Sequence, residues 1–212
     1  MQLGNLLSTL SAQSESLILS PEIFGDDKPL SLIPGSPMEL SGLSLDSRSV
    51  KPGHVFFAVF GTFTDGHNYI EKALDNGASV IVAERETESC ARCREQGIPY
   101  FVAKDMRRTI ARLAAEFYEH PSLSVHSIAV TGTNGKTSVA WLLASMYREL
   151  EGSAALIGTL GAGVIERGET PSFETLQTTT PNPIELQEAL SQARDSGVKY
   201  AAIEATSQGL VP

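Results

Sequence analysis

Residues 127–151 read SIAVTGTNGKTSVAWLLASMYRELE, and this stretch decides the fold. Residues 128–130 form a short apolar run that is typical of a buried strand. Gly132 and Gly135 allow a tight turn whose backbone N–H groups can face an anion. A helix after this turn would direct its partially positive N-terminus at the same anion. The order of strand, glycine-rich turn and helix therefore predicts a site for a nucleoside triphosphate.

The two residues after the second glycine carry the chemistry of the turn. Lys136 can reach the outer phosphates of a nucleotide, and the Thr137 hydroxyl is placed to ligate magnesium. The general phosphate-binding loop has a further glycine five residues before Gly135, where this chain has Val130. A glycine-rich turn with an incidental lysine is the alternative. The positions of strand, turn and helix favour the nucleotide loop.

The helix expected after the loop has one apolar face. Its large apolar residues recur at the spacing of side chains that share one side of a helix. Gly152 ends the pattern. We expect the helix to bury this face, which consists of Val139, Leu142, Leu143, Met146 and Leu150.

The composition narrows the class of protein. Of 212 residues, 42% are hydrophobic, enough for one large domain or two small ones with proper cores. The 16 basic residues compare with 25 acidic ones, and no run of lysine or arginine stands out, so a nucleic-acid surface is not expected. Neither an apolar stretch of about 18 residues nor a secretory signal pattern is present, which predicts a cytoplasmic protein without membrane insertion.

The two cysteines, Cys90 and Cys93, have the C-x-x-C spacing of a redox pair or of half a zinc site. The chain has no second cysteine pair, and its four histidines show no ligand spacing. Because the pair lies in a charged, polar stretch at residues 84–96, we expect surface thiols. A metal or redox role is the alternative.

Apolar runs alternate with helical patterns, which predicts an α/β fold with a mainly parallel sheet covered by helices. Strands are expected at residues 55–60, 79–83, 99–103, 128–130, 156–159 and 198–203. Helices are expected at residues 69–76, from Asp105 to His120, at the loop, and from an Asn182 cap to about residue 194. Pro121 ends the second of these, so we place a domain boundary near residue 122, between domains 1–122 and 123–212.

Three further segments carry polar chemistry. Glu204 follows the apolar run at residues 199–203, and a carboxylate at the end of a strand beside a phosphate loop can hold the magnesium of a nucleotide. The hydroxyl cluster at residues 178–180 either caps a helix or binds a phosphate or sugar. The segment LDSR at residues 45–48 is either a turn or an anion or sugar contact made by Ser47 and Arg48.

These motifs occur in the order in which the Mur ligase family has them. The loop TGTNGKT at residues 131–137 resembles the ATP loop of that family. LDSR with the later PG, and Gly61 with DGH at residues 65–67, resemble the N-terminal nucleotide-sugar domain of the enzymes that catalyse the third and fourth amino-acid additions in peptidoglycan synthesis. The segments TTPNPIELQ from residue 179 and IEATSQGL from residue 203 are similar to the third-step type. The resemblance covers essentially the whole chain.

The resemblance implies an N-terminal α/β nucleotide-sugar domain followed by part of a central ATPase-type domain. It implies an ATP-dependent, ADP-forming ligase that adds a diamino acid, meso-diaminopimelate or L-lysine, to UDP-N-acetylmuramoyl-L-alanyl-D-glutamate with Mg²⁺. The implied uridine-nucleotide contacts are Leu45, Ser47, Thr62, Phe63 and Thr64. The implied ATP contacts are Gly132, Thr133, Asn134, Gly135, Lys136, Thr137 and Ser138, with Lys136 and Glu204 as catalytic groups and Thr137 and Glu204 on magnesium. The implied contacts to the UDP-MurNAc-peptide are Thr179, Thr180 and Thr206.

Two departures from the family pattern matter. Gln208 stands where the family usually has a histidine that binds a second magnesium, and a neutral amide is a poorer partner for that ion. The sequence ends at Pro212, inside the family's central domain, so we expect a fragment that has no ligase activity alone. The alternatives are an inactive module that only binds UDP-MurNAc-peptide or ATP, the next-step Mur ligase, and a folate-polyglutamate-type ligase, against which LDSR argues.

Overall fold

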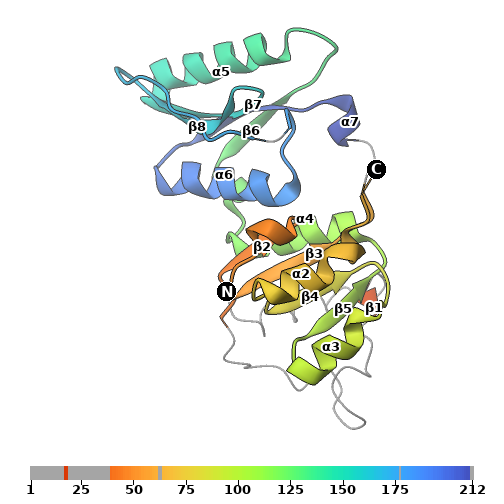
Figure 1. The fold of residues 1–212 in the computed structure, drawn as a ribbon. Coiled ribbons are helices and arrows are strands. Elements are labelled where there is room, and N and C mark those ends of the chain that lie inside the picture. The colour runs from red at the N-terminus through yellow and green to blue at the C-terminus, as the bar shows by residue number, and fades with distance from the viewer. Residues whose placement is uncertain (1–16, 19–38, 62–63, 177, 211–212) are drawn as a thin grey trace. The chain divides into compact units, whose positions relative to one another are not determined.

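A computed structural model of the chain describes residues 17–18, 39–61, 64–176 and 178–210. These residues divide into two compact units, one ending at Leu113 and the other beginning at Ala114. Each unit is built on its own sheet (Figure 1). The domain boundary near residue 122 stays a prediction.

The sheet of the first unit has four parallel strands and one short antiparallel strand at its edge. Its strand order is β1 (Leu17–Ile18), β5 (Tyr100–Ala103), β4 (Val80–Ala83), β3 (His54–Ala58) and β2 (Gly42–Ser44). Its helices are α2 (Ile70–Asp75), α3 (Ser89–Gln96) and most of α4 (Met106–Phe117), whose last residues belong to the second unit, with the 3-10 turns η3 (Ser47–Ser49) and η4 (Gly66–Tyr69). The mainly parallel α/β sheet that the sequence predicts is confirmed.

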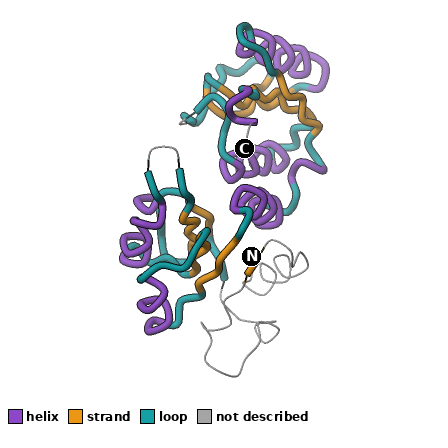
Figure 2. The backbone as a smooth tube through the Cα atoms, turned by 90° about the vertical axis from the view of Figure 1, so that its right-hand side faces the viewer, coloured by secondary structure: helices purple, strands orange, loops and turns teal. Residues whose placement is uncertain are grey.

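The strands of this sheet are buried on both faces because helices lie on both sides of it (Figure 2). Successive side chains of a strand point to opposite faces. Phe56 and Ile81 pack with residues of α2 and α3. Their neighbours Val55 and Phe57, which point to the opposite face, are also fully buried. The apolar face of α4 that the sequence predicts is buried at Met106, Ile110 and Leu113.

The expectation that Cys90 and Cys93 are surface thiols is wrong. Both lie on α3, a helix that the sequence analysis did not predict, and both are buried in the core between α3 and the sheet. Burial raises the pKa of Cys93 to about 12, so its thiol stays protonated at neutral pH. In the described part of the chain no group of three or more His, Cys, Asp or Glu side chains is arranged to hold a metal ion.

The sheet of the second unit lies between two long helices (Figure 1). Its strand order is β6 (His126–Val130), β9 (Tyr200–Glu204), β7 (Ser153–Gly158) and β8 (Gly161–Glu166), the first three parallel and β8 antiparallel to β7. The helices are α5 (Lys136–Glu151), α6 (Pro183–Asp195) and the short α7 (Ser207–Leu210), after the 3-10 turn η5 (Pro121–Leu123). Within the described ranges, no helix combines the length and apolarity that a bilayer crossing requires.

The two long helices of the second unit contact opposite faces of the sheet. On one face α5 buries Ala140 and Ala144 against Leu156 and Ala202. The residues of α6 that are buried on the other face are Leu190 and Ala193. Asn182 caps α6 as predicted, because its side chain accepts from two backbone N–H groups and Glu185 bonds back to the Asn182 N–H.

The prediction that α5 buries its large apolar residues is wrong. Val139, Leu142, Met146 and Leu150 are 46–74% exposed, and Leu143 is only partly buried. The fully buried residues of α5 at the sheet are instead its alanines, with Trp141, Leu143 and Tyr147 packed partly buried around them. Residues 128–130 do form a strand, but the expectation that this strand is buried is wrong. They belong to β6, an edge strand whose residues are all at least partly exposed.

This packing predicts that enlarging a small residue of α5 lowers the free energy of unfolding more than truncating a large one. Ala144→Leu adds three carbons where α5 meets the sheet and should lower the free energy of unfolding by about 1–3 kcal/mol. Leu142→Ala removes the same volume from an exposed position and should change it by about 0.5 kcal/mol or less. Urea unfolding followed by fluorescence of Trp141, the only tryptophan, measures both. A larger loss for Leu142→Ala than for Ala144→Leu would contradict the orientation of α5.

Candidate nucleotide and cation site

The loop between β6 and α5 is open to solvent and strongly turned. Residues 131–135 are all exposed. Gly132 has φ +144° and Gly135 has φ +77°, values that side-chain-bearing residues rarely adopt. Gly135 is the N-cap of α5, so the first backbone N–H groups of that helix face the loop. The Lys136 ammonium donates to the Gly132 carbonyl over 2.8 Å and so lies over the loop.

Strand pairing brings Glu204 to the base of this loop. β6 and β9 are parallel neighbours with Val130 opposite Glu204, and the Ala205 N–H donates to the Val130 carbonyl. The Glu204 side chain is buried, and its Oε2 accepts from Thr137 Oγ1 over 2.9 Å. Two residues that are 67 positions apart in the sequence therefore meet at the carboxyl edge of the sheet.

Thr159 is a third member of this group, and the sequence analysis missed it. Its backbone N–H donates to Glu204 Oε1 over 2.9 Å, and its hydroxyl donates to Glu204 Oε2 over 3.2 Å. It directly follows β7, on the other side of β9 from the loop. A hydroxyl residue directly after a strand that neighbours β9 was the available signal, but strand order is needed to recognise it.

The oxygen ligands at this edge suit a hard divalent cation. A threonine hydroxyl and a carboxylate are the ligands that Mg²⁺ uses beside the phosphates of a nucleotide. Thr137 and Glu204 supply one of each, in direct contact. The described residues offer no group of three His, Cys, Asp or Glu side chains that could hold a metal ion, so a cation here would need further ligands from phosphate or water.

The threonines before α6 form a second cluster in the same unit. Thr180 Oγ1 lies 3.0 Å from Thr206 Oγ1 and accepts from the Thr206 N–H over 2.8 Å. Thr179 Oγ1 accepts from the Thr159 hydroxyl over 3.2 Å. The structure thus brings the sequence-predicted residues Thr179, Thr180 and Thr206 to the edge that carries Glu204, whereas the helix cap itself is made by Asn182.

In the first unit, LDSR forms a capped turn. The Asp46 carboxylate accepts from the Arg48 backbone N–H and from its guanidinium, which lowers the pKa of Asp46. Arg48 is exposed, Ser47 is buried and Leu45 is half-buried. A turn is therefore present as the sequence alternative predicted, and a sugar contact at Ser47 or Leu45 stays a prediction.

The DGH segment fixes the loop after β3. His67 is buried, its Nε2 accepts from the Glu84 N–H, and its Nδ1 lies 2.5 Å from the Asp65 carboxylate. A side chain on Gly66 would overlap the backbone of Val59, with a Cβ only 2.6 Å from its oxygen. These contacts anchor residues 65–67, which directly follow Thr64.

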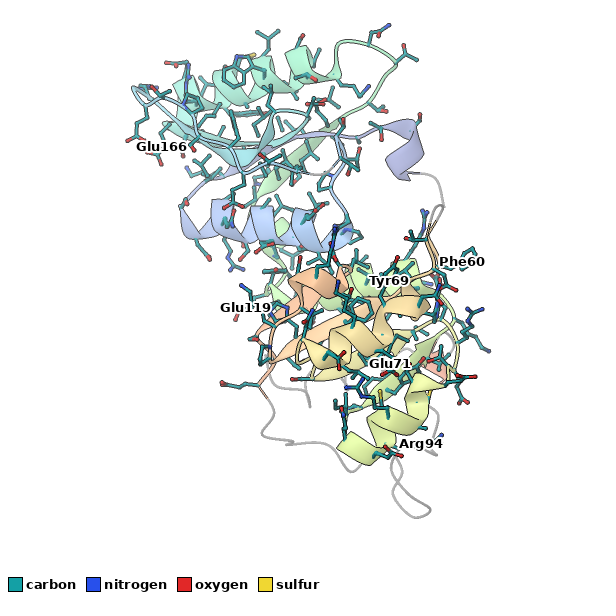
Figure 3. All side chains as sticks on the ribbon, in the orientation of Figure 1. Phe60, Tyr69, Glu71, Arg94, Glu119 and Glu166 are labelled. Atoms are coloured by element: carbon teal, nitrogen blue, oxygen red, sulfur yellow. The ribbon has the colours of Figure 1, made fainter. Side chains whose placement is uncertain are left out.

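Around this anchored segment several side chains face solvent. Thr64 is exposed, and its carbonyl accepts from the Gly61 N–H. The Phe60 ring points away from the unit, with 68% of its surface exposed (Figure 3). Thr62 and Phe63 lie outside the described residues. Gln208 lies in α7, and its effect on a second magnesium site stays a prediction.

Comparison with known proteins gives matches to both units. Residues 39–118 match the Mur ligase family catalytic domain, and residues 130–212 match the Mur ligase middle domain. The chain is 41% identical over 192 residues to a UDP-N-acetylmuramoyl-L-alanyl-D-glutamate–2,6-diaminopimelate ligase of Rhizobium meliloti, covering 91% of this chain and 35% of that protein. The ligase of the same name from Phocaeicola vulgatus is 37% identical over 179 residues, 84% of this chain and 35% of that protein.

Solved structures agree with these matches. A ligase of that name has a TM-score of 0.63 at 30% identity, covering 81% of this chain and 33% of that one. The MurF ligase of Thermotoga maritima in complex with ADP has a TM-score of 0.52 at 27% identity, covering 80% of this chain and 32% of that one. The chain spans about a third of the length of the relatives it matches. The chain belongs to the Mur ligase family, because residues 39–118 and 130–212 both match domains of that family.

Proposed function

We propose that this chain is the UDP-sugar- and ATP-binding part of an ADP-forming ligase that adds 2,6-diaminopimelate to UDP-N-acetylmuramoyl-L-alanyl-D-glutamate. The observation that carries the proposal is the contact between Thr137 and Glu204 at the base of the glycine loop. Diaminopimelate is favoured over L-lysine because the relatives quoted above are named for that amino acid. The higher TM-score to the diaminopimelate ligase than to MurF supports the third step over the fourth.

The proposed roles divide between the two units. In the first unit, Leu45, Ser47 and Thr64 contact the uridine nucleotide, together with Thr62 and Phe63. In the second unit, residues 132–138 bind ATP, and Thr137 and Glu204 hold Mg²⁺. Thr179, Thr180 and Thr206 contact the sugar-peptide. Their hydroxyls lie at the edge that carries Glu204, which supports this assignment.

The proposed chemistry is phosphoryl transfer followed by amide formation. A carboxylate of the dipeptide attacks the γ-phosphate of ATP, which gives an acyl phosphate, and ADP leaves. The amine then displaces phosphate from the acyl phosphate. A bound Mg²⁺ supplies positive charge beside the phosphate oxygens.

No side chain of this chain needs to act as a nucleophile, because such catalysis rests on positioning and on charge. The exposed loop N–H groups and the start of α5 provide a cradle for phosphates. The Lys136 ammonium, which lies over the loop, opposes the negative charge of the transferred group.

The proposal predicts that Lys136→Ala weakens ATP binding about 30-fold or more, since truncating one partner of a close charge pair costs about 2 kcal/mol or more. Lys199→Ala is the matched control, because Lys199 is exposed and pairs with Glu151 at the far end of α5. Isothermal titration calorimetry with Mg-ATP measures both affinities. Equal affinities of the Lys136→Ala variant and the parent chain would contradict the assignment of the loop.

The division of roles predicts separate NMR responses to two ligands. UDP added to the ¹⁵N-labelled chain should shift amide signals of Leu45, Ser47 and Thr64, because these residues are assigned to the uridine site. ATP should instead shift signals of residues 132–138. If UDP shifts only signals of the glycine loop, or shifts no signals in either segment, a uridine site in the first unit loses its support.

A further inference from the structure

Thr159 supplies two of the three hydrogen bonds that the Glu204 carboxylate receives within the described part of the chain. Its backbone N–H binds one carboxylate oxygen, and its hydroxyl binds the other. Two donors from one residue fix both the position and the rotation of the carboxylate plane. Thr137 donates to the same oxygen as the Thr159 hydroxyl.

Gly158 provides the space for this arrangement. β7 and β9 are parallel with Ile157 opposite Ile203, so Gly158 lies level with Glu204. A Cβ on Gly158 would lie 2.4 Å from Glu204 Oε1 and 2.7 Å from its carboxyl carbon. The carboxylate therefore lies against the bare backbone of Gly158 and reaches Thr159 directly. Glycine followed by threonine at the end of β7 is a cradle shaped for this side chain.

The Thr159 hydroxyl also connects the two polar clusters of the unit. It lies 3.2 Å from Glu204 Oε2 and 3.2 Å from Thr179 Oγ1. A hydroxyl has a single hydrogen, so Thr159 donates to one of these acceptors at a time. Whatever changes the hydrogen bonding of Thr179 therefore changes how firmly Glu204 is held.

We propose that Thr159 is a positioning residue that holds the Glu204 carboxylate for the cation and links the cation site to Thr179. The inference rests on the function proposed above, in which Glu204 binds Mg²⁺ and Thr179 contacts the sugar-peptide. Hydrogen-bond partners of a ligating carboxylate typically change metal affinity about 10- to 100-fold when they are removed. Thr159 is assigned that role, and it does not touch the reacting atoms.

The test compares Thr159→Val, which replaces the hydroxyl by a methyl group, with Thr159→Ser, which keeps it. Binding of Mn²⁺ to the 212-residue chain with a non-hydrolysable ATP analogue is measured from the free-Mn²⁺ signal in electron paramagnetic resonance. Thr159→Val should raise the Mn²⁺ dissociation constant about tenfold or more. Thr159→Ser should remain within about threefold of the parent. Affinity for the analogue in EDTA should be the same in all three proteins.

Thr170→Val is the matched control, because Thr170 is an exposed threonine of the same unit beyond β8. Trp141 fluorescence reports whether each variant is folded, and Thr159→Ala takes the place of Thr159→Val should the latter not fold. The inference about Thr159 is overturned if the folded variant keeps the parent's Mn²⁺ affinity, or if Thr159→Ser binds Mn²⁺ as weakly as Thr159→Val. Either result leaves the proposed function standing. A parent chain that binds the analogue but no Mn²⁺ contradicts the proposed cation site and the inference with it.

The link to Thr179 has its own readout. Thr179→Val removes one of the two acceptors of the Thr159 hydroxyl and leaves Glu204 as the other. This variant should therefore change Mn²⁺ affinity in a chain that keeps Thr159. In the Thr159→Val background the same change should have no effect. Equal effects in the two backgrounds would show that Thr179 acts on the cation site by another route.

Discussion

A buried carboxylate needs hydrogen-bond donors or a cation as partners. Glu204 is buried at the end of the three parallel strands of the second unit, so the segments around it must supply those partners. Its donors come from the start of α5 and from the end of β7, on either side of β9. Each hydrogen bond to a charged group contributes about 1.5–3 kcal/mol, and removing one donor leaves the buried carboxylate with fewer partners. The glycine loop, the strand order and the Gly158 cradle all meet at this one side chain.

The same requirement explains why this edge is a candidate site. Carboxyl ends of parallel strands gather loops that are far apart in the sequence, which is where α/β sheets bind ligands. Here the glycine loop, the residue after β7, the threonines before α6 and Glu204 all reach that edge. Thr159 and the loop are exposed, whereas the carboxylate that lies between them is buried.

The sequence predicted those parts of the fold that depend on local chemistry. Alternation of apolar runs with helical patterns located the central strands, and Asn182 followed by Pro183 located the start of α6. Periodicity also showed which residues of α5 share a face, but it could not show which face meets the sheet. Ala140 and Ala144 contact the strands because small residues allow close approach. Likewise, Cys90 and Cys93 share a helix face, and only the packed sheet shows that this face is buried.

The residues of the candidate site differ in how clearly the sequence marks them. Lys136, Thr137 and Glu204 could be recognised because each has a motif or a strand end to mark it. Thr159 could not, since its contact with Glu204 joins residues 45 positions apart and depends on β7 lying beside β9. The role of His67 was hidden for the same reason, because its partner Glu84 comes from another segment.

The most direct test of the account is the Mg²⁺ dependence of ATP binding by Glu204→Gln. This change keeps the shape of the side chain and removes the charge that is assigned to the cation. Calorimetric titrations with ATP in EDTA and in Mg²⁺ give the two affinities for each protein. The account predicts that Mg²⁺ strengthens ATP binding by the parent chain, and that Glu204→Gln loses this gain while it keeps the affinity measured in EDTA. The same Mg²⁺-dependent gain in the Glu204→Gln variant would contradict it.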